Sequence, residues 1–249
     1  MLTIEHLSKT YHGGVKAVDD LSFQVNNGEI VGFIGLNGAG KTTTLKMMSG
    51  ILRPDGGHVQ INDYSMETSP LEAKENIGYI ADSPDMFLRL RGMEYLNLIG
   101  DIYKVPVAKR KEKIESLTKR FDLFDALEEP MQSYSHGMRQ KMMVTAALLH
   151  EPDVWILDEP LTGLDPKSAF ALKQMMREHA DAGHSVLFST HVLEVAEKLC
   201  DRVVVIHHGR TLFIGTLEEL SLRYPKMDLE QIFLTMTKDE TMEPSSKEA

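Results

Sequence analysis

Four short segments of the chain are almost continuously apolar and rich in β-branched or aromatic residues. They occupy residues 28–35, 76–82, 153–160 and 185–190. Strands buried on both faces of a parallel sheet have this pattern, because neither face meets water. Between these segments, apolar residues recur with helical spacing at 41–52, 167–183 and 192–200, and Gly50 and Gly183 are expected to end the first two helices. Alternating strands and helices predict an α/β fold with a doubly wound parallel sheet.

Two regions depart from this alternation. Residues 1–11, 18–25 and 58–64 alternate between apolar and polar with a period of two, which predicts a small N-terminal antiparallel β subdomain with one face in water. Residues from about 85 to 150 have helical periodicity and no strand pattern, which predicts an inserted α-helical subdomain. The polar end of the chain, 237–249, is expected to be frayed.

Composition limits the cellular compartment and the classes of binding partner that are expected. The 249 residues are 42% hydrophobic and 26% charged, as in ordinary globular proteins, and the net charge of -10 disfavours nucleic acid as a partner. The single cysteine, Cys200, has no intrachain disulfide partner, and the N-terminus lacks the apolar stretch of a signal peptide. No apolar run approaches the roughly 20 residues that span a bilayer. We therefore expect a cytoplasmic protein that reaches a membrane only through a partner.

The stretch "GLNGAGKT", residues 35–42, lies between a predicted buried strand and a predicted helix. It fits the phosphate-binding pattern G-x-x-x-x-G-K-[ST], in which glycines let successive backbone N–H groups point at phosphates and the helix N-terminus adds positive charge. Lys41 is expected to reach the β and γ phosphates of ATP, and Thr42 to hold Mg²⁺. The expected nucleotide-binding residues are Gly35, Asn37, Gly38, Ala39, Gly40, Lys41, Thr42 and Thr43. This motif predicts a P-loop NTPase core.

Acidic residues and a histidine end two other predicted strands. Asp158 and Glu159 follow "VWIL", and His191 follows "SVLFST". In open α/β sheets, ligands bind at the carboxyl ends of the strands, so these side chains are expected near the phosphates. Asp158 suits Mg²⁺, Glu159 can accept a proton from the attacking water, and His191 can contact the γ phosphate and hold Glu159 in line. No histidine pair has the HExxH spacing of a zinc site.

The order of these elements resembles the ATP-binding cassette (ABC) family over nearly the whole chain, from "LTIEHLSKTY" to "RTLFIGT". The stretch "YSHGM", 134–138, stands at the family's signature position, and "GLD", 163–165, is similar to its D-loop, which includes Asp165. The resemblance makes His191 the switch histidine and Tyr11 the aromatic residue that stacks on adenine. It implies an ABC ATPase domain over 1–220, with the helical insertion between the Q-loop and the Walker B strand, followed by a C-terminal helix and tail over 221–249.

In the ABC family, two cassettes enclose the nucleotide head to tail, and the resemblance implies a homodimer or a heterodimer here. Ser135 and Gly137 would then meet the γ phosphate bound by Lys41 of the partner subunit, although a serine before an apolar helical segment is also the usual start of a helix. Two departures affect the site. His136 replaces the first glycine of the family's usual LSGGQ and would be an added donor, and Asp82 replaces a glutamine near Mg²⁺. Because Asp is shorter, it either binds the metal through water or does not reach it.

The signature variant looks most like ATPase subunits of bacterial exporters of drugs, antibiotics or sodium, whose polytopic membrane permease is a separate chain. The cassette would then work on the cytoplasmic side of the membrane. Phe87, Leu88 and Leu90 are candidate anchors for a coupling helix of that permease. Two alternatives stay open: a soluble ABC ATPase that drives assembly of a cytosolic complex such as iron-sulfur cluster machinery, and a regulatory cassette with weak turnover.

Overall fold

The larger sheet of the molecule is almost entirely parallel. The computed structural model describes residues 1–83 and 87–242, and side chains up to residue 238. A six-stranded sheet has the order β10-β9-β3-β8-β7-β6, and only β10 runs antiparallel to its neighbour. Its strands are β3 (Ile30–Ile34), β6 (Ile77–Ile80), β7 (Val154–Leu157), β8 (Ser185–Thr190), β9 (Arg202–His207) and β10 (Arg210–Thr216). The four predicted core strands and their parallel arrangement are confirmed.

Strand β9 and its hairpin partner β10 were missing from the predicted elements. The run Val203 to Ile206 is fully apolar and buried, so a strand pattern was present in the sequence. Because β9 pairs with β3 on the side opposite β8, it makes β3 an interior strand. The loop that leaves β3 therefore starts from the middle of the sheet.

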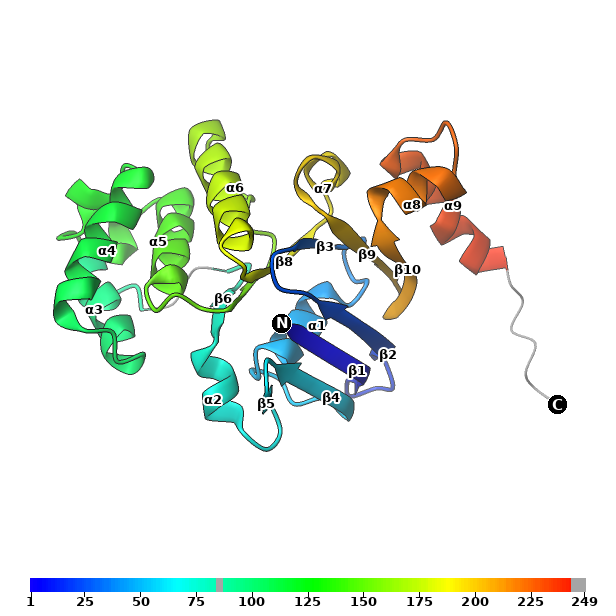
Figure 1. Ribbon diagram of the computed structural model, residues 1–249, viewed down its shortest axis with the longest axis horizontal. Coiled ribbons are helices and arrows are strands. Elements are labelled where there is room, and N and C mark those ends of the chain that lie inside the picture. The colour runs from blue at the N-terminus through cyan, green and yellow to red at the C-terminus, as the bar shows by residue number, and fades with distance from the viewer. Residues whose placement is uncertain (84–86, 243–249) are drawn as a thin grey trace.

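The N-terminal sheet is antiparallel, as predicted. Its order is β2-β1-β4-β5, built from β1 (Leu2–Thr10), β2 (Lys16–Val25), β4 (Gly56–Ile61) and β5 (Tyr64–Ser65). The apolar face of this sheet, helix α1 (Lys41–Met48) and one face of the parallel sheet share a single buried cluster. Helix α1 lies between the two sheets in Figure 1. The phosphate loop that precedes α1 is thus anchored on both sides.

The described chain between β6 and β7 is helical, which confirms the predicted insertion of helices. It contains α3 (Gly92–Ile102), α4 (Val107–Arg120), two 3₁₀ turns (Phe124–Ala126 and Met131–Ser133) and α5 (His136–Leu148). Helices α3, α4 and α5 form one end of the molecule in Figure 1, and α2 (Pro70–Glu75) lies before β6. The residue limits 85–150 remain a prediction. Within the described ranges, none of the helices combines the length and low polarity that crossing a bilayer requires.

The remaining helices follow β7, β8 and β10. They are α6 (Pro166–Asp181), α7 (Leu193–Leu199), α8 (Leu217–Arg223) and α9 (Leu229–Met242). Gly50 and Gly183 follow α1 and α6 with φ of 67° and 91°, so each ends its helix in the left-handed conformation, as predicted. The predicted boundary at residue 220 falls inside α8, and the division into two parts stays a prediction.

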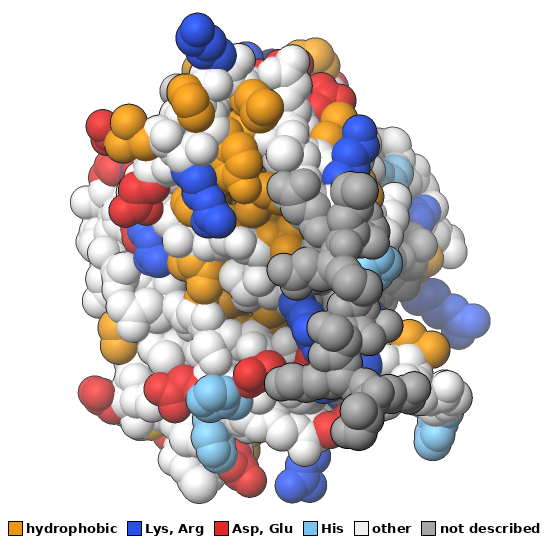
Figure 2. Space-filling view, turned by 90° about the vertical axis from the view of Figure 1, so that its right-hand side faces the viewer, with side chains coloured by type: hydrophobic (Ala, Val, Ile, Leu, Met, Phe, Trp, Pro, Cys, Tyr) orange, Lys and Arg blue, Asp and Glu red, His pale blue; other side chains and the backbone are white. Residues whose placement is uncertain are grey.

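The C-terminal helices pack on the parallel sheet. Ile232, Phe233 and Met236 of α9 join a buried cluster with Ile34 of β3 and Ala196 of α7. Figure 2 looks at the face at this end of the molecule and shows a group of apolar side chains in its upper half. Large apolar side chains exposed on β10, α8 and α9 are Ile214, Leu222 and Leu234. The polar end, 237–249, was expected to be frayed, but residues 237–242 continue helix α9, so the expectation is wrong for them. Residues 243–249 lie outside the described residues.

Candidate functional site

The phosphate loop is a tight turn that only glycine permits at two positions. Gly38 and Gly40 have φ of 83° and 105°, and Gly40 caps the N-terminus of α1. A Cβ atom on Gly40 would lie 2.4 Å from the carbonyl oxygen of Ala17, so a larger residue would displace the loop. Lys41 is buried inside the turn, and its Nζ donates to the carbonyl oxygen of Gly35 at 2.7 Å. A carbonyl oxygen of the loop thus accepts the hydrogen bond that an anionic ligand would take from Lys41.

Asp158 directly follows β7 in a fully buried position, with 0% of its surface exposed. Its Oδ1 accepts a 2.6 Å hydrogen bond from the Ser189 hydroxyl, whereas Oδ2 is buried and has no hydrogen-bond partner within the described chain. Burial raises the pKa of this carboxyl, the charges of Asp82 and Glu159 raise it further, and the side chains of Ser189 and Thr42 oppose the shift. A free carboxylate oxygen beside Thr42 fits Mg²⁺, which binds oxygen ligands directly or through water.

Glu159 lies between two cationic or potentially cationic groups. Its Oε1 is 3.4 Å from Lys41 Nζ, and its Oε2 is 3.0 Å from His191 Nδ1. The residue has a φ of 46°, a conformation that is uncommon outside glycine. This geometry brings together three residues that the sequence predicted as the catalytic group.

Ser189 was not among the predicted site residues, although it organises both acids. Its Oγ donates to Asp158 Oδ1 and accepts from the backbone N–H of Glu159 at 2.9 Å. It is fully buried near the carboxyl end of β8. A serine inside the apolar run "SVLFST" was the available signal, because a buried hydroxyl needs hydrogen-bond partners.

Tyr11, His191 and Asp82 lie around this centre. Tyr11 is 44% exposed, and its hydroxyl is 3.4 Å from Thr43 Oγ1, so its ring stands beside the phosphate loop. His191 has a side chain that is 50% exposed and free to meet a ligand. Asp82 is exposed after β6, and its charge helps to raise the pKa of Asp158 and of Tyr79. Its predicted role at the metal remains a proposal.

Ser135 begins α5, which agrees with its interpretation as a helix start. Its Oγ accepts from the backbone N–H of Met138 at 3.2 Å, the usual N-cap hydrogen bond. Tyr134 is buried, and its hydroxyl donates to the carbonyl oxygen of Ala126 at 2.6 Å, which makes it a core residue. Ser135 and Gly137 belong to the inserted helices, whereas the phosphate loop belongs to β3 and α1. A contact with the γ phosphate therefore depends on the second subunit that the resemblance implies.

Asp165, expected at the nucleotide, caps α6 in this chain. Its Oδ1 accepts from the Ser168 backbone N–H at 3.0 Å and its Oδ2 from the Ser168 hydroxyl at 2.5 Å. The hydrogen bonds from Ser168 lower the pKa of the Asp165 carboxyl to about 2, and the charge of Lys141 adds to them. The cap explains this residue within one subunit, and a nucleotide contact stays a prediction.

The cap predicts an acid-dependent stability. Because the folded-state pKa of Asp165 is below its ordinary value of 3.8, the ionised carboxylate stabilises the fold above that value and loses its contribution as pH falls towards 2. We expect Asp165→Asn, which keeps an acceptor but no charge, to melt a few degrees below the wild type at pH 7. The difference in melting temperature should narrow as pH falls from about 4 towards 2, because the wild-type carboxylate becomes protonated over that range. A gap that stays constant down to pH 2 contradicts this role.

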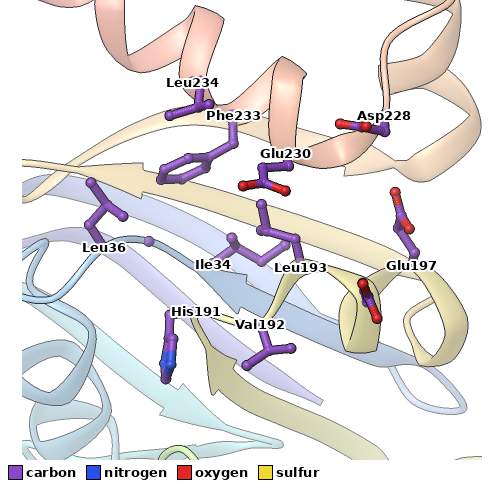
Figure 3. Close-up of a pocket in the computed structure, with 12 residues that line it drawn as sticks. Ile34, Leu36, His191, Val192, Leu193, Glu197, Asp228, Glu230, Phe233 and Leu234 are labelled. Carbon is purple, nitrogen blue, oxygen red and sulfur yellow. The ribbon is translucent and has the colours of Figure 1, made fainter.

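A cavity of about 520 Å³ lies beside the phosphate loop and under α9 (Figure 3). Leu36, Phe233 and Leu234 lie on one side of the cavity, at the left in Figure 3, and His191 lies below them in that view. Its lining also includes four carboxylates, from Glu194, Glu197, Asp228 and Glu230. Such a lining would repel polyphosphate, so we expect a phosphate ligand at the N-terminus of α1 and not in this cavity.

Comparisons with known proteins agree with this geometry. The family model described as ABC transporter matches residues 18–162. The ABC transporter ATP-binding protein NatA of Bacillus subtilis is 35% identical over 94% of this chain and 97% of its own length. The Nod factor export ATP-binding protein I of Ralstonia nicotianae is 33% identical over 94% of this chain and 72% of its own. A solved structure of an ATP-binding subunit of an ABC transporter superposes with a TM-score of 0.90 at 34% identity, covering 95% of this chain and 99% of that one.

Proposed function

The chain belongs to the ABC transporter family as an ATP-binding subunit, and on that premise we propose that it hydrolyses ATP to drive a separate membrane permease, in the direction of export. The observation that carries the proposal is the Glu159 carboxylate, held between Lys41 and His191 at the carboxyl end of the parallel sheet. Export is supported by the similarity to the Nod factor export protein.

Binding of ATP would begin at the phosphate loop. Tyr11 stacks on adenine, while the backbone N–H groups of the loop and the N-terminus of α1 surround the phosphates. Lys41 exchanges its bond to the Gly35 carbonyl for the β and γ phosphates. Thr42 and Asp158 would hold Mg²⁺, which supplies positive charge to the developing negative charge on the phosphate oxygens. Asp82 would reach the metal through water.

Hydrolysis then needs a base in line with the γ phosphorus. Glu159 accepts a proton from the attacking water, and His191 holds the carboxylate through the 3.0 Å contact between Nδ1 and Oε2. Ser189 fixes the backbone of Glu159 and one oxygen of Asp158. Because both acids depend on one buried hydroxyl, the metal ligand and the base keep a fixed relative position.

The complete site would form between two subunits arranged head to tail, either identical or related. Ser135, Gly137 and the backbone N–H groups at the start of α5 would meet the γ phosphate that Lys41 of the partner subunit binds. The Asp165 region would line the same interface. ATP stabilises the closed dimer because it binds both faces, and hydrolysis removes that stabilisation.

The inserted helices are the proposed contact with the permease. Phe87 is 46% exposed, and its ring lies 5.7 Å from that of Tyr95, measured between centroids. Leu88 is half-buried and Leu90 packs against the core, so Phe87 is the side chain best placed to anchor a coupling helix. Because ATP is supplied by the cytoplasm, the subunit would work on the cytoplasmic side of the membrane.

Fractionation of cells tests the assignment to transport. We expect the protein to sediment with membranes when its separately encoded polytopic partner is present, and to lose most of that association when the partner is deleted. Phe87→Asp should reduce the association by about tenfold, since a charge would replace an apolar anchor. Leu71→Asp, at an exposed apolar residue of α2, is the matched control.

A stoichiometric complex that stays outside the membrane fraction would instead favour the assembly ATPase. Negligible ATP turnover in the presence of the partner would favour the regulatory cassette and overturn the proposed hydrolysis.

A further inference from the structure

The first turn of α5 packs against the loop that follows Glu159. We call residues 159–165 the acid loop, because they begin at the proposed base. A Cβ atom on Gly163 would lie 2.5 Å from Cδ2 and 3.1 Å from Nε2 of His136, so the imidazole ring rests directly on the Gly163 backbone. In return, a Cβ atom on Gly137 would lie 2.8 Å from the Gly163 carbonyl oxygen. Gly163 thus makes room for the His136 ring, and Gly137 makes room for the Gly163 carbonyl oxygen.

Two further contacts join α5 to the acid loop. Near the beginning of the loop, Nε2 of the buried Gln140 donates to the Pro160 carbonyl oxygen at 3.4 Å. At its end, Lys141 Nζ lies 3.7 Å from Asp165 Oδ2. The His136 ring covers the middle. Helix α5 therefore touches the loop near both ends and at its centre, all within one subunit.

His136 stands where the family's usual signature has glycine, and a glycine there would leave Gly163 without this cover. We propose that His136 is a positioning residue that ties the signature serine, Ser135, to the acid loop of its own subunit. This inference rests on the proposed function. A nucleotide that contacts Ser135 from the partner subunit then also restrains the loop that carries Glu159. Nucleotide binding at one site of the dimer would therefore affect catalysis at the other.

The physical basis is the ordering of a loop. Contact of a phosphate with Ser135 fixes the first turn of α5, and the His136 ring passes that restraint to Gly163. Gly163 has a φ of 77°, and without a Cβ atom it has more backbone freedom to lose than other residues. A coupling carried by a single packed contact is expected at the lower end of the usual range, about 5- to 20-fold. The orientation of the ring towards Gly163 favours this role over donation to a phosphate of the partner subunit.

Substitutions at position 136 separate packing from hydrogen bonding. In the purified full-length protein with Mg-ATP, we expect His136→Gly to lower kcat about tenfold, to change KM less than threefold, and to bring the Hill coefficient for ATP to 1. His136→Phe keeps a flat ring without nitrogen, so it should restore at least half of the wild-type kcat and the cooperativity. A His136→Phe variant as impaired as His136→Gly would assign a donor role and overturn the positioning role.

A reciprocal pair tests the contact itself. Gly163→Ala would place a methyl group against the His136 ring and should lower kcat, and adding His136→Gly should recover part of that loss. Gly183→Ala is the matched control, because Gly183 has a φ of 91° and nothing within 4 Å of its Cβ position. It carries the same backbone strain without the contact, and should leave kcat unchanged.

The outcomes also distinguish this inference from the proposed function. An active, cooperative wild type whose His136→Gly variant has unchanged kcat and Hill coefficient overturns the inference alone. A wild type that neither binds nor hydrolyses ATP overturns the proposed function and this inference with it. Strictly additive effects of His136→Gly and Gly163→Ala on kcat would also overturn the inference, since residues in contact are expected to couple.

Discussion

Glu159→Gln is expected to lower kcat for ATP hydrolysis at least 100-fold while the protein still binds ATP. Glutamine has nearly the same shape but does not accept a proton, and general-base catalysis contributes about 10²- to 10⁴-fold in rate. The substitution also removes a negative charge 3.4 Å from Lys41 Nζ, which should leave ATP affinity equal or stronger. Phosphate release at saturating Mg-ATP measures kcat, and equilibrium titration with a fluorescent ATP analogue measures binding.

Glu112→Gln is the matched control for this variant. Glu112 is an exposed acid on α4, away from the phosphate loop, and its replacement should leave turnover within about twofold. The assignment of the base is wrong if Glu159→Gln turns over ATP at the wild-type rate.

Ser135→Arg is expected to abolish ATP-dependent dimerisation and to lower turnover about 100-fold or more. A long side chain would fill the space in which the γ phosphate of the partner subunit approaches the first turn of α5. Binding of ATP to the single subunit should persist, because the phosphate loop and α1 are untouched. Size-exclusion chromatography of the Glu159→Gln background, with and without Mg-ATP, measures the dimer directly, since trapped ATP keeps it closed.

Loss of the helix cap is a separate effect of Ser135→Arg. Removing an N-cap hydroxyl costs about 1 kcal/mol, too little to unfold a domain of this size. Thr216→Arg removes a comparable cap from α8, where Oγ1 of Thr216 accepts from the Glu219 backbone N–H at 3.1 Å. Its dimerisation and turnover should match the wild type. Unchanged dimerisation in Ser135→Arg would mean that the signature does not act across the interface.

Much of the fold was predictable because its strands are buried on both faces. The runs around β3, β6, β7 and β8 show no polar face, and this pattern was enough to predict a parallel sheet. Strand β9 has the same apolar composition, so its pattern could have been recognised, but it was left out of the predicted elements. Its place next to β3 was not readable from sequence, because strand order depends on which connections cross the sheet.

The candidate site was predictable where a motif imposes a backbone shape. The phosphate loop needs glycine at positive φ, and the acids and His191 follow strands whose carboxyl ends meet at one edge. Ser189 escaped prediction because a single hydroxyl within an apolar strand has no distinctive pattern. Asp165 was assigned to the nucleotide through resemblance, whereas its hydrogen bonds to Ser168 depend on where α6 begins.

By itself, the amino-acid sequence determined the backbone pattern of the phosphate loop, and it predicted a base and a metal ligand from local residue type and spacing. Tertiary structure alone decided which residues share a contact. It placed Glu159 between Lys41 and His191, and it turned His136, an unexplained substitution in the signature, towards Gly163. The reason is physical: local patterns set backbone conformation, whereas contacts between distant segments depend on how sheets and helices pack, which no single stretch of sequence encodes.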